Sequence, residues 1–223
     1  MEDRAAGVGP AARVLVVGYG NPLRSDDGVG RVVAEQLMAD PRLAGAEVRT
    51  AHQLTPELAL DASRVDVLVL IDAADGVPPG EVVVRDLAEH GRQGIADGGR
   101  AGHTLEGGPP LTHHVDPASI VGLAATLWGA APRTIMVGVG PASFDLGEAL
   151  TPVVEAAVPR AVEAVVAAVV AAIAAIAAIA AIEVRAASAA RDGARAVAAP
   201  ETAASAAPAA ESAASAAPAA EEG

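Results

Sequence analysis

An acidic pair, Asp26 and Asp27, lies in the stretch GYGNPLRSDDGVG at residues 18–30, which begins where the apolar run RVLVVG ends. A glycine-rich turn at this place could bind phosphate, but phosphate loops favour a lysine and disfavour carboxylates facing the anion. The chain contains no lysine, so phosphate is disfavoured. Two interpretations stay open: Ser25 and the two aspartates could simply stabilise the first turn of a helix, or an aspartate could bind a metal ion.

Two further groups are expected at the same edge of the fold. Asp72 ends the apolar run VDVLVLIDA, and the adjacent His113 and His114 precede a helix start at DPAS. The carboxyl ends of parallel strands meet at one edge of a sheet, where α/β proteins bind their ligands. Asp27, Asp72 and one of the two histidines would then provide two carboxylates and an imidazole. This donor set suits Ni²⁺ or Zn²⁺ and leaves coordination positions open.

A regular alternation of strands and helices would position these residues. Short runs rich in valine and isoleucine predict strands at residues 13–18, 46–51, 65–73, 80–87 and 133–140. Helices are expected between them at residues 27–40, 55–63 and 116–129. The first, third and fifth strands are apolar at nearly every position, as in strands covered on both faces. The sequence therefore predicts a three-layer α/β/α sandwich around a central twisted, mostly parallel sheet of about five strands.

The composition changes along the chain and becomes rich in alanine after Pro159. The apolar run at residues 164–182 is long enough to span a membrane, but alanine contributes little to insertion, which favours a helix that packs partly on the sheet. We therefore do not expect a membrane as a partner. The predicted segments are a flexible N-terminus at 1–12, the α/β domain at 13–163, an Ala-rich helical extension at 164–199 and a low-complexity acidic disordered tail at 200–223.

The overall composition restricts the class of protein. Without cysteine, the chain can form no disulfide, thiolate nucleophile or cysteine-based zinc site. A formal charge of −13 and a single Trp, Tyr and Phe leave little for binding phosphates or stacking bases, so no nucleic-acid partner is expected. The stretch MEDRAAGVGPAARV does not have the apolar core of a secretory signal. These features together predict a cytoplasmic protein.

Four motifs together resemble one known family. They occur in order between about Arg13 and Pro159: GYGNPLRSDDGVG, the strand-ending Asp72, THH at residues 112–114, and VGVGPASFDLGEALTP at residues 137–152. In this arrangement the chain resembles the hydrogenase maturation endopeptidases, the nickel-dependent proteases that process the large subunits of [NiFe]-hydrogenases. That family has an α/β/α fold with a twisted sheet of about five strands, in agreement with the pattern of runs described above.

The resemblance implies a site and a reaction. In the family, an acidic residue of the first motif, a strand-ending aspartate and a histidine bind the metal. The corresponding residues are Asp27, Asp72 and His113, with His114 as the alternative to His113. The implied reaction removes the C-terminal extension of the [NiFe]-hydrogenase large-subunit precursor after nickel insertion. The nickel is expected to come with that precursor, and zinc or another divalent metal could substitute for it.

The group that activates water stays open at this stage. A metal ion could polarise the scissile carbonyl or lower the pKa of a bound water, and Asp26 or Asp27 could act as general base. A serine or cysteine nucleophile is disfavoured, since no serine lies in a nucleophile-elbow pattern. The main alternative function is a non-catalytic α/β accessory module that binds a nucleotide or another ligand. A second alternative is a membrane-tethered protease with residues 164–182 inserted.

Overall fold

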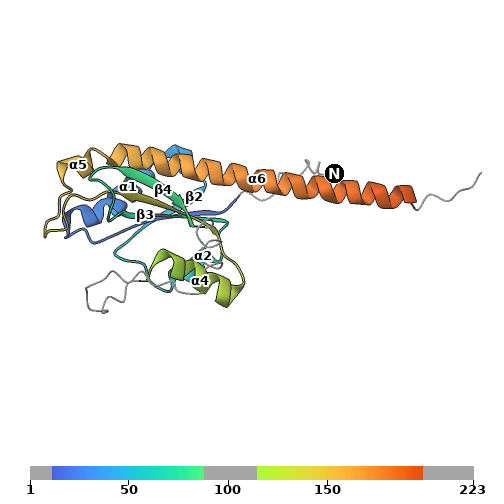
Figure 1. Cartoon of the computed structure of the whole chain (residues 1–223), viewed down its shortest axis with the longest axis horizontal. Helices are drawn as coiled ribbons and strands as arrows, with labels where there is room; N and C mark the ends of the chain where they lie inside the picture. Colours follow the sequence, from blue (N-terminus) through green and yellow to red (C-terminus); the bar gives the residue numbers. More distant parts are fainter. Residues whose placement is uncertain (1–11, 88–114, 198–223) are drawn as a thin grey trace, which may run out of the picture. The chain divides into compact units, whose positions relative to one another are not determined.

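The computed structural model describes residues 12–87 and 115–197, which are organised around a five-stranded sheet with the order β2-β1-β3-β5-β4 (Figure 1). The strands are β1 (Val14–Tyr19), β2 (Ala46–Ala51), β3 (Val67–Ala73), β4 (Val82–Asp86) and β5 (Arg133–Val139). Strands β2, β1, β3 and β5 are parallel, and β4 pairs with β5 in the antiparallel direction. The predicted mostly parallel sheet is therefore confirmed.

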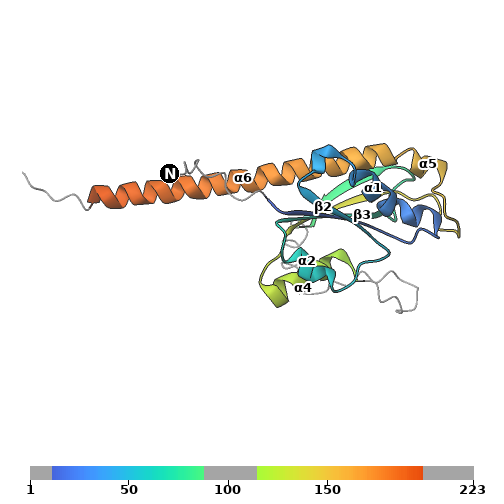
Figure 2. The ribbon, with the colours of Figure 1, turned by 180° about the vertical axis from the view of Figure 1, so that it is seen from behind.

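Helices cover both faces of this sheet (Figures 1 and 2). One face carries α1 (Val29–Leu37) and the first part of α6 (Val158–Val197), and the other carries α2 (Leu58–Ala62) and α4 (Pro117–Trp128). The short helix α5 (Pro152–Glu155) precedes α6, and 3-10 turns η1 (Ser25–Gly28) and η2 (Pro41–Leu43) lie before and after α1. This is the α/β/α sandwich that the sequence predicts.

Two apolar clusters, one on each face, hold the layers together. Successive strand residues point to opposite faces of a sheet. Val16 and Val69 accordingly pack with α1 and α6, whereas Leu15 and Leu68 pack with α2 and α4. Because both faces are buried, β1 and β3 are apolar at nearly every position and do not alternate with polar residues.

The helix predicted at residues 27–40 is divided in the structure into η1 and α1. The first N–H groups of a helix have no partner within it. Here Ser25 N–H donates to the carbonyl oxygen of Gly147 at 2.7 Å, and Asp26 N–H donates to that of Ser143 at 3.3 Å. The segment before α1 is thus fixed by a loop that follows β5, which the sequence pattern does not reveal.

Helix α6 is continuous over 40 residues and passes through position 163, where the composition predicts a boundary. The last buried side chain of α6 in the apolar cluster is that of Ala172. The chain divides into two compact units, Met1–Ile179 and Ala180–Gly223. The stretch Pro152–Arg191 is long and apolar enough to cross a membrane by length and composition alone, a test that core helices of soluble proteins also pass. The predicted disordered tail at 200–223 lies outside the described residues.

Candidate functional site

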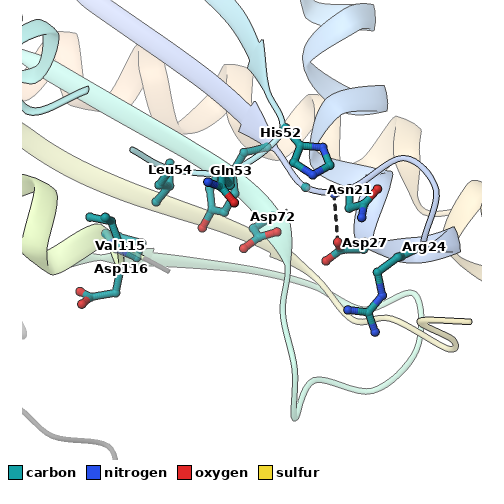
Figure 3. Close-up of a pocket in the computed structure, with 12 residues that line it drawn as sticks. Asn21, Arg24, Asp27, His52, Gln53, Leu54, Asp72, Val115 and Asp116 are labelled. Atoms are coloured by element: carbon teal, nitrogen blue, oxygen red, sulfur yellow. Dashed lines mark hydrogen bonds between the residues drawn. The ribbon is translucent and has the colours of Figure 1, made fainter. Parts of the chain in front are cut away.

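A cavity of about 470 Å³ opens at the carboxyl ends of β1 and β3, where the motifs predict a site (Figure 3). We call it the site cavity. Asp27 enters it from η1 and Asp72 from the end of β3, so the structure brings these two predicted site residues together. The other described lining residues come from the end of β1 and the turn after it, from the segment after β2, and from the segment that leads into α4: Tyr19, Gly20, Asn21, Arg24, His52, Gln53, Leu54, Val115, Asp116 and Pro117.

The turn after β1 fixes Asp27 in the site cavity. Asn21 N–H donates to Asp27 Oδ2 at 2.9 Å (Figure 3), and Asn21 Oδ1 accepts from Leu23 N–H at 3.0 Å. Gly20 has a φ of 132°, and a Cβ atom there would collide with the carbonyl oxygen of Asp27. Only glycine therefore lets the strand end approach η1 this closely, which gives the glycine of the motif a physical reason.

Asp72 is partly buried at the other side of the site cavity. Burial raises the pKa of Asp72 to about 7, and the negative charge of Asp27 adds to the increase. Hydrogen bonds from Tyr19 and from Ala73 N–H, the latter at 2.8 Å, partly oppose this rise. Two carboxylates that repel each other in a partly buried cavity are an arrangement that a bound cation stabilises.

Tyr19 is a site residue that the sequence analysis missed. Gly18 of β1 is in register with Ile71 of β3, so Tyr19 and Asp72 follow as neighbours on adjacent parallel strands. Burial raises the pKa of the Tyr19 hydroxyl, as do the charge of Asp72 and a hydrogen bond with it. The hydroxyl therefore stays protonated and can donate to the Asp72 carboxylate. The available signal was the aromatic residue inside the GYGN motif.

The loop before α1 uses most of its backbone amides within the protein, whereas a phosphate loop directs them at the anion. Four successive N–H groups donate to carbonyl oxygens of the protein. The donors are Arg24 to Asn21, Ser25 to Gly147, Asp26 to Ser143 and Asp27 to Arg24, at 2.7–3.3 Å. This geometry agrees with the argument from sequence against phosphate.

Asp26 is fully buried, and it is not among the described residues that line the site cavity. Its carboxylate accepts four hydrogen bonds, from the N–H groups of Ala142 at 2.8 Å, Ser143 at 3.0 Å and Thr151 at 2.7 Å, and from the Thr151 hydroxyl at 2.9 Å. Burial opposes its ionisation, but these hydrogen bonds hold the pKa of Asp26 below its usual value. The contacts make Asp26 the anchor of the loop at residues 142–151.

His113 and His114 lie outside the described residues, so their predicted role as the third ligand stays a prediction. The residues that follow them directly, Val115 to Pro117, line the site cavity. Within residues 12–87 and 115–197, no group of three or more histidine or acidic side chains could hold a metal ion. The described part of the chain thus provides two carboxylates of the predicted donor set.

No family model and no curated protein matches the chain. Solved structures do match it. A hydrogenase 2 maturation peptidase from a Thaumarchaeota archaeon is 26% identical with a TM-score of 0.52, and the match covers 70% of this chain and 97% of that one. The hydrogenase maturating endopeptidase HybD from E. coli is 28% identical with a TM-score of 0.51, covering 70% and 91%.

A [NiFe] hydrogenase maturation protease, HycI from Thermococcus kodakarensis, has the same fold at 20% identity, with a TM-score of 0.54 and coverage of 70% and 90%. The chain is thus a structural relative of the hydrogenase maturation endopeptidases, as the four sequence motifs predict. The match spans nearly the whole length of these relatives, and about 30% of this chain lies beyond it.

Proposed function

We propose that the chain is an endopeptidase that removes the C-terminal extension of a [NiFe]-hydrogenase large-subunit precursor after nickel insertion. The observation that carries the proposal is that Asp27 and Asp72 line one cavity, at the carboxyl edge of a sheet whose fold is that of hydrogenase maturation peptidases. The absence of cysteine suits a reducing compartment, and we assign the activity to the cytoplasm.

The proposed role of Asp27, Asp72 and His113 is to bind the nickel ion that the precursor carries, with His114 as the alternative to His113. Two carboxylates near each other and the proximity of residue 115 to the cavity support this donor set. When bound, such an ion supplies Lewis-acid polarisation of a carbonyl or a water of lowered pKa. Zinc or another divalent metal is proposed to substitute for nickel.

The chain's own residues orient the two carboxylates for this task. Asn21 N–H holds one oxygen of Asp27, and Ala73 N–H holds one oxygen of Asp72. Each carboxylate thus has a defined direction before substrate arrives, which reduces the cost of ordering it on binding. Asp26 is fully engaged in holding the loop at 142–151, so we assign proton transfer from water to the groups that face the cavity and not to Asp26.

A cleavage assay tests the proposal directly. The purified full-length chain is mixed with its cognate large-subunit precursor, with and without nickel, and the products are identified by intact mass. We expect loss of a C-terminal peptide only from the nickel-loaded precursor. If the chain does not cleave a demonstrably nickel-loaded precursor, and nucleotide raises the melting temperature of the chain, the protease function is refuted. The alternative function, a non-catalytic accessory module that binds nucleotide, would then be supported.

A further inference from the structure

We propose that the substrate segment next to the scissile bond binds as an added strand along the outer edge of β2, with its side chains directed into a second cavity beside that strand. The inference rests on the proposed function and deepens it, because it assigns a place to the polypeptide that the site cavity would cleave. The ligand class is an extended polypeptide segment, held mainly through its backbone.

The first observation is the position of β2 at the edge of the sheet. Among the residues that the structure describes, β2 pairs only with β1, so its other side presents alternate N–H and C=O groups to an added strand. The carboxyl end of β2 continues directly into His52 and Gln53, which line the site cavity. A segment paired with β2 would therefore be led to Asp27 and Asp72.

The other edge strand does not offer this connection. Strand β4 forms the opposite edge of the sheet, and Val84 on it is 50% exposed. The residues of β4, all of which the structure describes, are not among those that line the site cavity. The two edges thus differ in their relation to the candidate site, and this difference provides a matched control.

The second observation is a cavity of about 220 Å³ beside β2, which we call the β2 cavity. Gln53 lines both cavities, so they adjoin at this residue. The apolar lining residues Val17, Ala51 and Leu58 belong to β1, β2 and α2. Because alternate side chains of a strand point to the same side, a segment on the edge of β2 can direct every second side chain into this space.

Two of the three charged residues that line the β2 cavity, Arg49 and Asp61, are paired with each other, and the third, Glu57, is exposed and hydrogen-bonded to Thr55. Arg49 contacts Glu47 at 2.6 Å and Asp61 at 2.6 Å. The uncharged polar residues of the lining are Thr50, Gln53 and Thr55, and Gln53 also lines the site cavity. This lining favours recognition by shape and backbone hydrogen bonds over recognition of a single charged side chain.

Site-specific photocrosslinking tests the path of the substrate without requiring cleavage. Glu57, an exposed residue that lines the β2 cavity, is replaced by p-benzoylphenylalanine, and the control carries the same replacement at Val84 on β4. We expect Glu57→p-benzoylphenylalanine to crosslink to the nickel-loaded precursor at residues flanking the cut, with about tenfold less from the control. Equal crosslinking, or crosslinking from Val84 alone, would overturn the inference.

Kinetics provide the second arm. Thr55→Trp should fill the β2 cavity and raise KM about tenfold while kcat stays within about twofold, whereas Val84→Trp should leave both unchanged. In peptides spanning the cleavage site, N-methylation of successive amides should weaken binding at every second position, as strand addition requires. Suppose that the wild-type chain cleaves the precursor, that Thr55→Trp has the wild-type KM, and that the methylated peptides bind as well as the unmethylated ones. The strand-addition inference is then wrong, while the proposed function still holds. If the wild-type chain does not cleave, the proposed function fails.

Discussion

Thr151 donates both its backbone N–H and its hydroxyl to the carboxylate of Asp26, at 2.7 Å and 2.9 Å. The two residues are separated by 125 positions in the chain, and Asp26 is the immediate neighbour of Asp27. The two adjacent aspartates therefore have different roles. Asp26 binds the loop after β5 to η1 through hydrogen bonds, and Asp27 lines the site cavity. The rigidity of the site depends on a residue that does not enter it.

Asp26→Asn should destabilise the fold by about 1–3 kcal/mol at pH 7, because a buried carboxylate that accepts four hydrogen bonds is replaced by an amide that cannot accept them all. The folded-state pKa of Asp26 lies below its usual 3.8. Its contribution is therefore present above pH 4 and is lost as the pH falls through the folded-state pKa. Urea unfolding at pH 7 and pH 3 measures this. Glu148→Gln, an exposed change in the same loop, serves as control, and a pH-independent difference would contradict the argument.

Asp27→Ala and Asp72→Ala should each reduce precursor cleavage on the order of 100-fold or more, because each removes a proposed ligand of the nickel ion. Asp75→Ala is the matched control, since Asp75 follows β3 closely but is exposed and is not among the described lining residues. Intact-mass kinetics and nickel titration of the chain give the two readouts. Full activity in either cavity variant would refute the ligand assignment.

The location of the site follows from the sequence, because apolar runs that end in glycine or aspartate define where strands stop. Asp72 illustrates this: a charged residue at the end of a buried run has to emerge at the sheet edge. The turn that follows β1 can also be predicted from the sequence, because Gly20 and Asn21 are residues that favour a turn at this position. Both features depend on residues that are close together in the chain, and such local features can be predicted from a single sequence.

The missed features depend on pairings between distant segments. The contact between Tyr19 and Asp72 requires the register of β1 against β3, and the role of Asp26 requires the path of the loop at 142–151. One further difference is local: α6 begins at Val158, before the predicted extension at 164–199, because Pro159 is tolerated in the first turn of a helix and does not end it. Neither register nor loop path is fixed by composition or periodicity.

Asp72→Asn should stabilise the metal-free protein at neutral and alkaline pH. In the folded state the pKa of Asp72 is raised to about 7 from 3.8, so the unfolded chain ionises first and folding is penalised as the pH rises. The stability advantage of the variant should be absent near pH 3, grow between pH 4 and pH 7, and stay constant above. Melting temperatures in EDTA across this range measure it, and a constant difference would mean that burial does not perturb this carboxyl.

Tyr19→Phe should leave the fold intact and lower nickel affinity or cleavage about 10–100-fold, the usual effect of removing a partner that orients a metal ligand. The phenyl ring retains the packing of Tyr19 against the α2–α4 cluster and loses only the hydroxyl. Isothermal titration with Ni²⁺ and cleavage kinetics report on orientation, and the melting temperature reports on packing. An unchanged affinity with a lowered melting temperature would indicate a purely structural tyrosine.

Deletion of residues 180–223 should leave both the melting temperature and the cleavage rate close to those of the full chain. The apolar cluster that joins α6 to the sheet includes buried side chains only as far as Ala172, with Ile176 partly buried against it. Beyond this point Ile182 and Val184 are 68% and 69% exposed, so the removal of residues 180–223 costs little burial. Calorimetry and the precursor assay compare the two chains, while fractionation of cells shows whether either sediments with membranes. A loss of activity confined to membrane-bound protein would favour the tethered alternative, since the remaining apolar run would then be too short to span a bilayer.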